Sequence, residues 1–207
     1  MRRLTFLAIL CGVAFAQTER FDVHALLKIA RISEPQLSPD GKLVAFTVQR
    51  MDVENNTSSK QIYVVPASGG EPKQITSEGN NSRPRWSPDS KRIAFVSTRS
   101  GSSQIWTMNP DGTGATQVTR LATEADGVIF SPSGKHLVFT SEVYPECADE
   151  ACNRKKLEEE KAAKVKARIY TSLLYRHWNE WKGKRRKHLF VIPVEGGAAR
   201  DLSLIHI

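Results

Sequence analysis

The stretch Pro35-Gln-Leu-Ser-Pro-Asp-Gly-Lys-Leu-Val-Ala-Phe46 decides the fold, because the chain contains it three times with small changes. The other copies are Pro84-Arg-Trp-Ser-Pro-Asp-Ser-Lys-Arg-Ile-Ala-Phe95 and Val128-Ile-Phe-Ser-Pro-Ser-Gly-Lys-His-Leu-Val-Phe139. Ser-Pro followed by Asp or Ser and then Gly or Ser is typical of a turn, and the alternating apolar run after it is typical of a strand. The serines that open the turns are 49 and 44 residues apart. Short strands repeated at this period predict a β-propeller.

A second motif follows each turn motif and completes the repeated unit. It reads Gln61-Ile-Tyr-Val-Val-Pro, then Gln104-Ile-Trp-Thr-Met-Asn, then His188-Leu-Phe-Val-Ile-Pro, each followed by a glycine turn and a short strand. Two strands around each turn make four per unit, the number in a propeller blade. A β-sandwich with similar hairpins is the alternative. We predict an all-β fold, a partial β-propeller of about three four-stranded blades over residues 34–207, with blades at about 34–79, 82–121 and 126–203.

One copy of the turn differs at the position that favours glycine. Gly41 and Gly134 tolerate a positive φ there, whereas the second copy has Ser90. We therefore expect the second turn to be slightly strained or of another type.

The first residues do not belong to the propeller. Arg2 and Arg3 precede an apolar stretch, and Ala14-Phe15-Ala16 matches a signal-peptide cleavage site. We predict a signal peptide over 1–16, which is too short to span a bilayer, and a secreted or periplasmic mature chain. Residues 17–33 are expected to lead into the first blade with a short helix over 21–30, in which Asp22 lies near the start.

The third unit is interrupted by an insertion over 142–187. Within it, Ala162, Val165, Ile169 and Leu173 fall on one face of a helix that the spacing predicts over 155–175. Such a helical insertion in the third blade has two interpretations. It is a brace against a neighbouring domain or blade edge, or a surface that binds a substrate or partner.

Charge and cysteine content restrict the function. The net charge is +8, and +6 of it lies between Tyr144 and His188, so the blades themselves are balanced and no nucleic-acid motif accompanies the charge. After signal removal, Cys147 and Cys152 remain. In an oxidising compartment they would form a disulfide, and two free thiols are the alternative. No second Cys or His pair has metal-ligand spacing, so we expect no metal site.

The paired blade motifs, Phe21-Asp-Val-His-Ala-Leu-Leu and above all Ala167-Arg-Ile-Tyr-Thr-Ser-Leu-Leu-Tyr-Arg-His-Trp-Asn-Glu-Trp181 resemble the prolyl oligopeptidase family, in its secreted dipeptidyl-peptidase and acylaminoacyl-peptidase branch. The resemblance covers Phe21 to Ser203. It implies an N-terminal propeller that covers a C-terminal α/β-hydrolase domain, whose Ser-Asp-His triad cleaves short peptides without a cofactor. The propeller of such an enzyme gates access and helps to bind the substrate's N-terminus.

The chain departs from the family at the catalytic machinery. It contains no Gly-x-Ser-x-Gly, the motif that presents the nucleophile in an α/β-hydrolase. We therefore assign no catalytic residue, and we expect the hydrolase domain to be missing from this chain and the chain alone to be inactive. An incomplete array of blades exposes apolar faces, so association with copies of itself is expected.

The resemblance also directs attention to residues that would touch an oligopeptide. Arg176, His177 and Trp178 form a cluster suited to stacking and pairing, and packing against the missing hydrolase domain is its alternative role. Glu180 is a carboxylate suited to a substrate ammonium. Glu158, Glu159 and Glu160 are more simply interpreted as a solvated helix face with partners four residues away, such as Lys164 for Glu160.

The sequence also fits a second class of function. The Ser-Pro-Asp-Gly repeats also occur in TolB-like propellers, which are protein-binding modules of the cell envelope without catalysis. A downstream Gly-x-Ser-x-Gly would distinguish the enzyme from the binding module.

Overall fold

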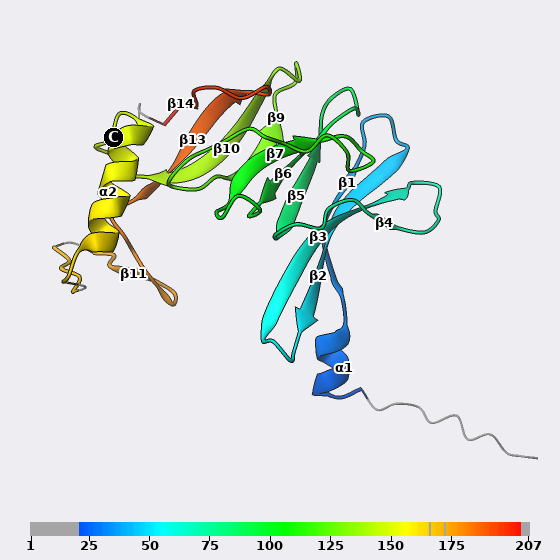
Figure 1. Ribbon diagram of the computed structural model, residues 1–207, viewed down its shortest axis with the longest axis horizontal. Helices are drawn as coiled ribbons and strands as arrows, with labels where there is room; N and C mark the ends of the chain where they lie inside the picture. The colour runs from blue at the N-terminus through cyan, green and yellow to red at the C-terminus, as the bar shows by residue number, and fades with distance from the viewer. Residues whose placement is uncertain (1–20, 166, 172, 204–207) are drawn as a thin grey trace, which may run out of the picture.

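The computed structural model describes residues 21–165, 167–171 and 173–203. In these ranges the strands form three four-stranded antiparallel sheets, which follow one another across the molecule in chain order (Figure 1), and a separate two-stranded hairpin. The three large sheets are not closed into a ring. The prediction of an all-β, partial β-propeller is therefore confirmed. The predicted signal peptide lies outside the described residues.

Each blade pairs its strands in chain order, and the third resumes with β13 after the insertion. The first blade comprises β1 (Arg31–Leu37), β2 (Leu43–Asp52), β3 (Thr57–Pro66) and β4 (Lys73–Gln74). The second comprises β5 (Asn81–Trp86), β6 (Ile93–Ser97), β7 (Gln104–Met108) and β8 (Thr116–Gln117). The third comprises β9 (Asp126–Phe130), β10 (His136–Val143), β13 (Arg186–Pro193) and β14 (Arg200–Asp201).

The repeated turn has the same backbone geometry in all three blades. The amide of its opening serine donates to a carbonyl across the turn, from Ser38 to Leu43 (2.8 Å), Ser87 to Arg92 (2.9 Å) and Ser131 to His136 (2.8 Å). The residue three positions after each serine has a left-handed φ, at Gly41 (73°), Ser90 (63°) and Gly134 (71°). The second copy thus keeps the turn and is strained at Ser90, because a non-glycine residue in this region costs about 1 kcal/mol.

The second motif also repeats its hydrogen bonds. A backbone amide of the third strand donates to a hydroxyl beyond the fourth, from Ile62 to Thr76 (2.9 Å), Ile105 to Thr119 (2.8 Å) and Leu189 to Ser203 (2.8 Å). In the third blade His188 takes the place of the glutamines of the other two. Its ring is buried, and its Nδ1 lies 2.6 Å from an Asp201 carboxylate oxygen. These equivalences show that the blades are true structural repeats.

The hydrophobic core lies between neighbouring blades rather than within any one of them. One cluster joins the first two sheets around Ile62, Trp86 and Phe95, and the Trp86 indole donates to the Gln36 carbonyl of the first blade at 2.9 Å. The other cluster joins the second and third sheets around Phe139 and Ile105, both fully buried. Each blade is therefore stabilised by its neighbour, as in other repeat folds. Exposed aliphatic side chains remain on the first and third blades, at Ile32, Leu37, Ile129 and Leu189.

The lead helix is shorter than predicted. Helix α1 (Val23–Lys28) begins after Asp22, whose carboxylate accepts the Ala25 amide at 2.8 Å as an N-cap. No described helix is long and apolar enough to cross a membrane.

The helix in the insertion is displaced from its predicted position. Helix α2 is Glu150–Ala162, not 155–175, because it begins at the N-cap Asp149 and ends where Ala163 turns to an extended backbone. The expected apolar face has nothing to pack against, since Val165, Ile169 and Leu173 are 74%, 89% and 84% exposed. Helices in proteins depend on packing of such a face, so the chain beyond Ala162 does not continue the helix.

Candidate functional site

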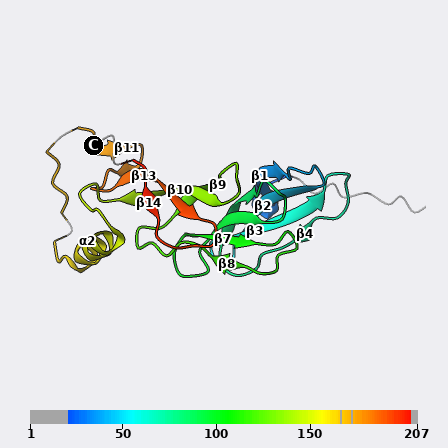
Figure 2. The ribbon, with the colours of Figure 1, turned by 90° about the horizontal axis from the view of Figure 1, so that it is seen from above.

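The insertion is held beside the end of the third blade (Figure 2). It leaves β10 at Val143 and passes through a disulfide between Cys147 and Cys152, whose Cα atoms are 5.4 Å apart. At the start of α2, Asn153 is buried and its side-chain oxygen accepts the Tyr144 amide at 2.9 Å. The disulfide and this hydrogen bond fasten the helix to the blade.

Tyr144 is the second anchor of α2. Its ring is 3% exposed, and its hydroxyl donates to a Glu160 carboxylate oxygen at 2.6 Å. Burial, followed by the hydrogen bond and the charge of Glu160, raises the pKa of Tyr144 to about 12. Glu160 is thus engaged with the blade, and Lys164, its expected partner, lies beyond the end of the helix.

Beyond α2 the chain forms a small hairpin of β11 (Arg176–His177) and β12 (Glu180–Trp181). Arg176 lies opposite Trp181, and His177 lies opposite Glu180. Trp178, in the turn, has a φ of 50° and its carbonyl accepts a hydrogen bond from Arg176 Nε at 2.6 Å. The Lys182 amide donates to the Tyr175 carbonyl at 2.9 Å and extends the pairing. The hairpin therefore has a defined conformation although its side chains are exposed.

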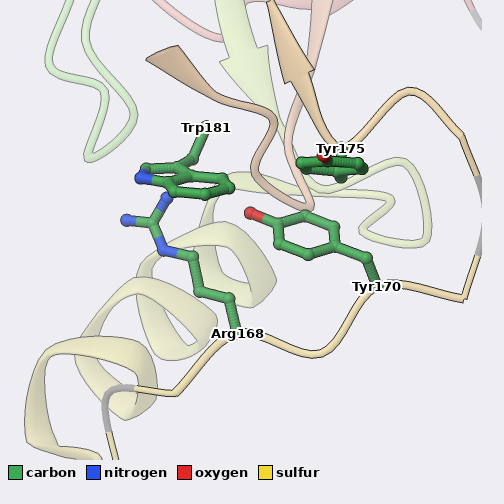
Figure 3. Close-up of a pocket in the computed structure, with 4 residues that line it drawn as sticks. All are labelled: Arg168, Tyr170, Tyr175 and Trp181. Atoms are coloured by element: carbon green, nitrogen blue, oxygen red, sulfur yellow. The ribbon is translucent and has the colours of Figure 1, made fainter. Parts of the chain in front are cut away.

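A pocket of about 700 Å³ lies between this hairpin and the segment after α2. It is lined by Arg168, Tyr170, Tyr175 and Trp181 (Figure 3). The centroids of the Tyr170 and Tyr175 rings are 5.6 Å apart, and each lies 6.1 Å from the Trp181 ring. In Figure 3 the Arg168 side chain points toward the side of the pocket that Trp181 forms. The volume is within the usual range for small-molecule or side-chain pockets.

The residues named from the sequence lie around this pocket and not in its lining. Arg176 contacts a residue of the lining, because its guanidinium carbon lies 5.9 Å from the centroid of the Trp181 indole. His177 contacts Trp178 edge to face at 6.4 Å, and Trp178 itself is 85% exposed. Glu180 is exposed on β12, across from His177. The structure thus brings the four onto one hairpin.

Sequence reasoning missed the lining residues as a group. Arg168, Tyr170, Tyr175 and Trp181 all lie in the segment that carries the family resemblance, but the expected helix over 155–175 separated them. The available signal was the concentration of aromatic residues around two arginines, a composition that is common at binding surfaces.

The acidic residues of α2 are not gathered into an ammonium site. Glu158 and Glu159 are exposed, and Glu159 pairs with Lys155 at 3.9 Å. Among the described residues, no group of three or more His, Cys, Asp or Glu side chains is placed to hold a metal ion. The groups that the insertion presents around the pocket are aromatic rings and guanidinium groups, which can stack with one another and with ligands.

Comparisons with known proteins agree with this architecture. Residues 17–163 match the TolB beta propeller domain. Dipeptidyl-peptidase 5 of Porphyromonas endodontalis is 33% identical over 178 residues, which are 85% of this chain and 25% of that protein. Dipeptidyl-peptidase 5 of Porphyromonas gingivalis is 37% identical over 164 residues, 79% of this chain and 23% of that protein. The chain thus spans about a quarter of these relatives.

A solved structure of Pyrococcus horikoshii acylaminoacyl peptidase shares the fold. It superposes with a TM-score of 0.62 at 20% identity, over 83% of this chain and 24% of the peptidase. The relatives and this fold are consistent with the propeller portion of a prolyl oligopeptidase-family peptidase. With three blades in place and most of its length matched, the chain belongs to the TolB β-propeller domain family.

Proposed function

We propose that this chain is the N-terminal propeller portion of a longer, secreted serine exopeptidase that hydrolyses short peptides. In that protein the propeller gates access to a catalytic α/β-hydrolase domain, and the insertion of the third blade contributes to substrate recognition. One observation carries the proposal. The chain is a propeller with an aromatic and basic insertion, and its curated relatives are dipeptidyl-peptidases about four times as long.

The structure gives the gating proposal a physical basis. The blades bury their apolar side chains against one another, and the insertion is fastened to one blade end by Tyr144, Asn153 and the disulfide. A rigid scaffold with an exposed recognition segment is the common arrangement for binding residues. In this proposal a peptide that approaches along the third blade meets the pocket and Arg176.

Peptidase activity of the longer protein tests the proposal. The gene downstream of Ile207 is expected to encode Gly-x-Ser-x-Gly, and the full-length protein is expected to release a fluorogenic amine from dipeptide or N-acyl amino acid amides. Replacing the serine of that motif by alanine should abolish the release and the labelling by a fluorophosphonate. A full-length protein without that motif, or with undiminished turnover in the alanine variant, would exclude a serine peptidase.

The contribution of the insertion is tested in the same full-length protein. Arg176→Ala is expected to lower kcat/KM about fivefold, because it removes a guanidinium from beside the pocket, while the melting temperature stays unchanged. Arg50→Ala, an exposed arginine of β2 in the first blade, is the matched control and should leave kcat/KM unchanged. Equal kinetics of the two variants would remove Arg176 from substrate recognition.

A second function has its own support. The matched family model is named for TolB, so a non-catalytic propeller that binds proteins in the cell envelope is the alternative. A reading frame that stops soon after the ring closes, together with capture of an envelope protein by the purified chain, would favour it. Proteolysis of the chain in intact cells and in osmotically shocked cells would establish whether it lies outside the cytoplasm.

A further inference from the structure

The pocket on the insertion has a chemical character that a general role in substrate recognition does not specify. We propose that it binds an aromatic side chain within an acidic peptide: the ring enters among Tyr170, Tyr175 and Trp181, and neighbouring carboxylates pair with the arginines. This inference rests on the proposed function, because it takes an oligopeptide as the ligand and adds which oligopeptides are preferred.

The three aromatic rings supply the shape. Their centroids lie 5.6 and 6.1 Å apart, at the separations that aromatic rings adopt when they pack against one another. Tyr170, Tyr175 and Trp181 remain 36%, 46% and 53% exposed, so each ring keeps area that a ligand would bury. A further flat ring suits these walls better than a branched aliphatic group, because it contacts several ring faces or edges at once.

Charge supplies the second requirement. Residues 163–187 contain nine of the chain's 30 Lys and Arg but only one of its 22 Asp and Glu. The rest of the chain therefore holds 21 of each sign, and this segment alone accounts for the net charge of +8. A concentration of one sign around a recess raises the local concentration of ligands of the other sign. The segment is thus suited to carboxylates.

Two arginines of this segment lie at the pocket, so the preference for carboxylates applies to the pocket itself. Arg168 lines the pocket, and Arg176 lies 5.9 Å from the centroid of the Trp181 ring. Of the residues that the structure describes, the four that line the pocket include no carboxylate, and the one acidic residue of the segment, Glu180, lies across the hairpin from His177. A free ammonium would meet like charge here, whereas a carboxylate would meet guanidinium groups that pair with it in a bidentate manner. The pocket is therefore unsuited to the N-terminus of a substrate.

The same basic and aromatic composition also occurs in segments that lie on anionic membranes. Ile169, Leu173 and Trp178 are highly exposed and would contribute to such binding. The geometry favours the peptide, because three of the aromatic rings of the segment surround a recess instead of standing on a convex, apolar tip. Lipid binding is accordingly an outcome that the experiment must be able to show.

Calorimetric titration of the purified chain with matched peptides tests the proposal. Acetyl-Glu-Phe-Glu-amide should bind about tenfold more tightly than acetyl-Lys-Phe-Lys-amide or acetyl-Glu-Ala-Glu-amide, because only the first has both the ring and the carboxylates. Its affinity should fall by about tenfold between 50 and 500 mM salt, since the charges are exposed. Arg168→Gln is expected to weaken binding about fivefold and Trp181→Ala to abolish it, while Arg168→Lys, which keeps the charge but not the bidentate fork, should weaken it about twofold.

Lys91→Gln, which removes an exposed charge from a turn of the second blade, is the control and should leave the affinity unchanged. Circular dichroism would show that each variant keeps its fold. Equal affinities for the Glu and Lys peptides, or an unchanged affinity in Arg168→Gln, would overturn the proposal. So would binding to vesicles containing phosphatidylglycerol without binding to any peptide. Failure of the peptidase assay in the longer protein leaves these binding results unaffected, so the two proposals fail separately.

Discussion

The blades and the insertion use the same kinds of residue in opposite ways. In the blades, large apolar side chains such as Phe139 are fully buried between sheets, and equivalent residues make equivalent hydrogen bonds in each repeat. In the insertion, Ile169 and Trp178 are 89% and 85% exposed, and the aromatic rings contact one another at a surface pocket. The difference shows that the buried core lies in the repeats, whereas side chains of the insertion remain exposed.

The two regions also differ in how strongly each is constrained. A core side chain of a blade is packed against the neighbouring sheet, so a change of its volume is felt directly. The insertion is fastened mainly at its beginning, by the disulfide and by Tyr144 and Asn153. Substitutions between the end of α2 at Ala162 and the start of β13 at Arg186 are therefore expected to alter binding with little effect on unfolding.

The largest expected effect tests this contrast directly. Phe139→Ala removes a fully buried ring from between the second and third blades, and it should lower the free energy of unfolding by about 4 kcal/mol. Ile169→Ala, its counterpart in the insertion, should change it by less than about 0.5 kcal/mol because the side chain is exposed. Urea denaturation followed by tryptophan fluorescence measures both. Comparable losses would mean that the insertion is part of the core.

The next effect concerns the close approach of two blades. A Cβ at Gly112, whose φ is +91°, would lie 2.5 Å from the Ile75 carbonyl oxygen of the first blade. Gly112→Ala should therefore cost about 3 kcal/mol, from backbone strain together with the displacement of β4. Gly41→Ala is the matched control: its φ is +73° and a Cβ there meets nothing within 4 Å, so only strain of about 1 kcal/mol is expected.

The two glycine variants can be compared by their denaturation midpoints. A midpoint shift in Gly112→Ala no larger than that of Gly41→Ala would show that the first two blades do not approach as closely as the structure has them.

The Tyr144 hydroxyl gives the attachment of the insertion a pH dependence. Its pKa is raised to about 12 in the folded chain, whereas an unfolded tyrosine titrates near about 10. The fold thus favours the neutral phenol, and this stabilisation is complete below about pH 10 and is lost as the pH rises through about 12. Tyr144→Phe removes the hydrogen bond to Glu160, a loss of about 1 kcal/mol at neutral pH.

The difference in unfolding free energy between wild type and Tyr144→Phe should therefore shrink between pH 10 and pH 12. Guanidinium denaturation at intervals across that range measures it. A difference that stays constant with pH would show that the phenol is not buried against the carboxylate.

The fold was predictable from the sequence because each blade contains its own copy of the turn motif. Ser38, Ser87 and Ser131 each precede a proline and an alternating apolar run, and local turn chemistry does not depend on distant contacts. Repetition then adds what a single copy lacks, because three similar units in order favour stacked blades over a sandwich. The order of strands in the third blade also followed, since His188 resumes the second motif after the insertion.

The site was less predictable because its residues depend on where the chain goes after α2. The spacing of Ala162, Val165, Ile169 and Leu173 is helical, but periodicity forms a helix only where the apolar face is buried. The structure leaves that face without a neighbour, and the extended chain carries Arg168 and Tyr170 to the hairpin instead. Arg176, His177 and Trp178 were identified as a cluster and Glu180 as a separate carboxylate, whereas the pocket beside them was not identified.

The smallest expected effect compares one blade with its neighbour. Ser90 adopts a φ of 63° where the other blades have glycine, and its hydroxyl accepts the Asp40 amide of the first blade at 3.1 Å. Ser90→Gly relieves about 1 kcal/mol of backbone strain. It also loses this exposed hydrogen bond and adds conformational freedom to the unfolded chain, so the expected net stabilisation is about 0.5 kcal/mol. Gly134→Ser, the reciprocal change at a φ of 71°, should destabilise by about 1 kcal/mol. Thermal denaturation of both variants measures the pair. A lower melting temperature in Ser90→Gly would mean that the contact between the two turns contributes more than the backbone strain costs.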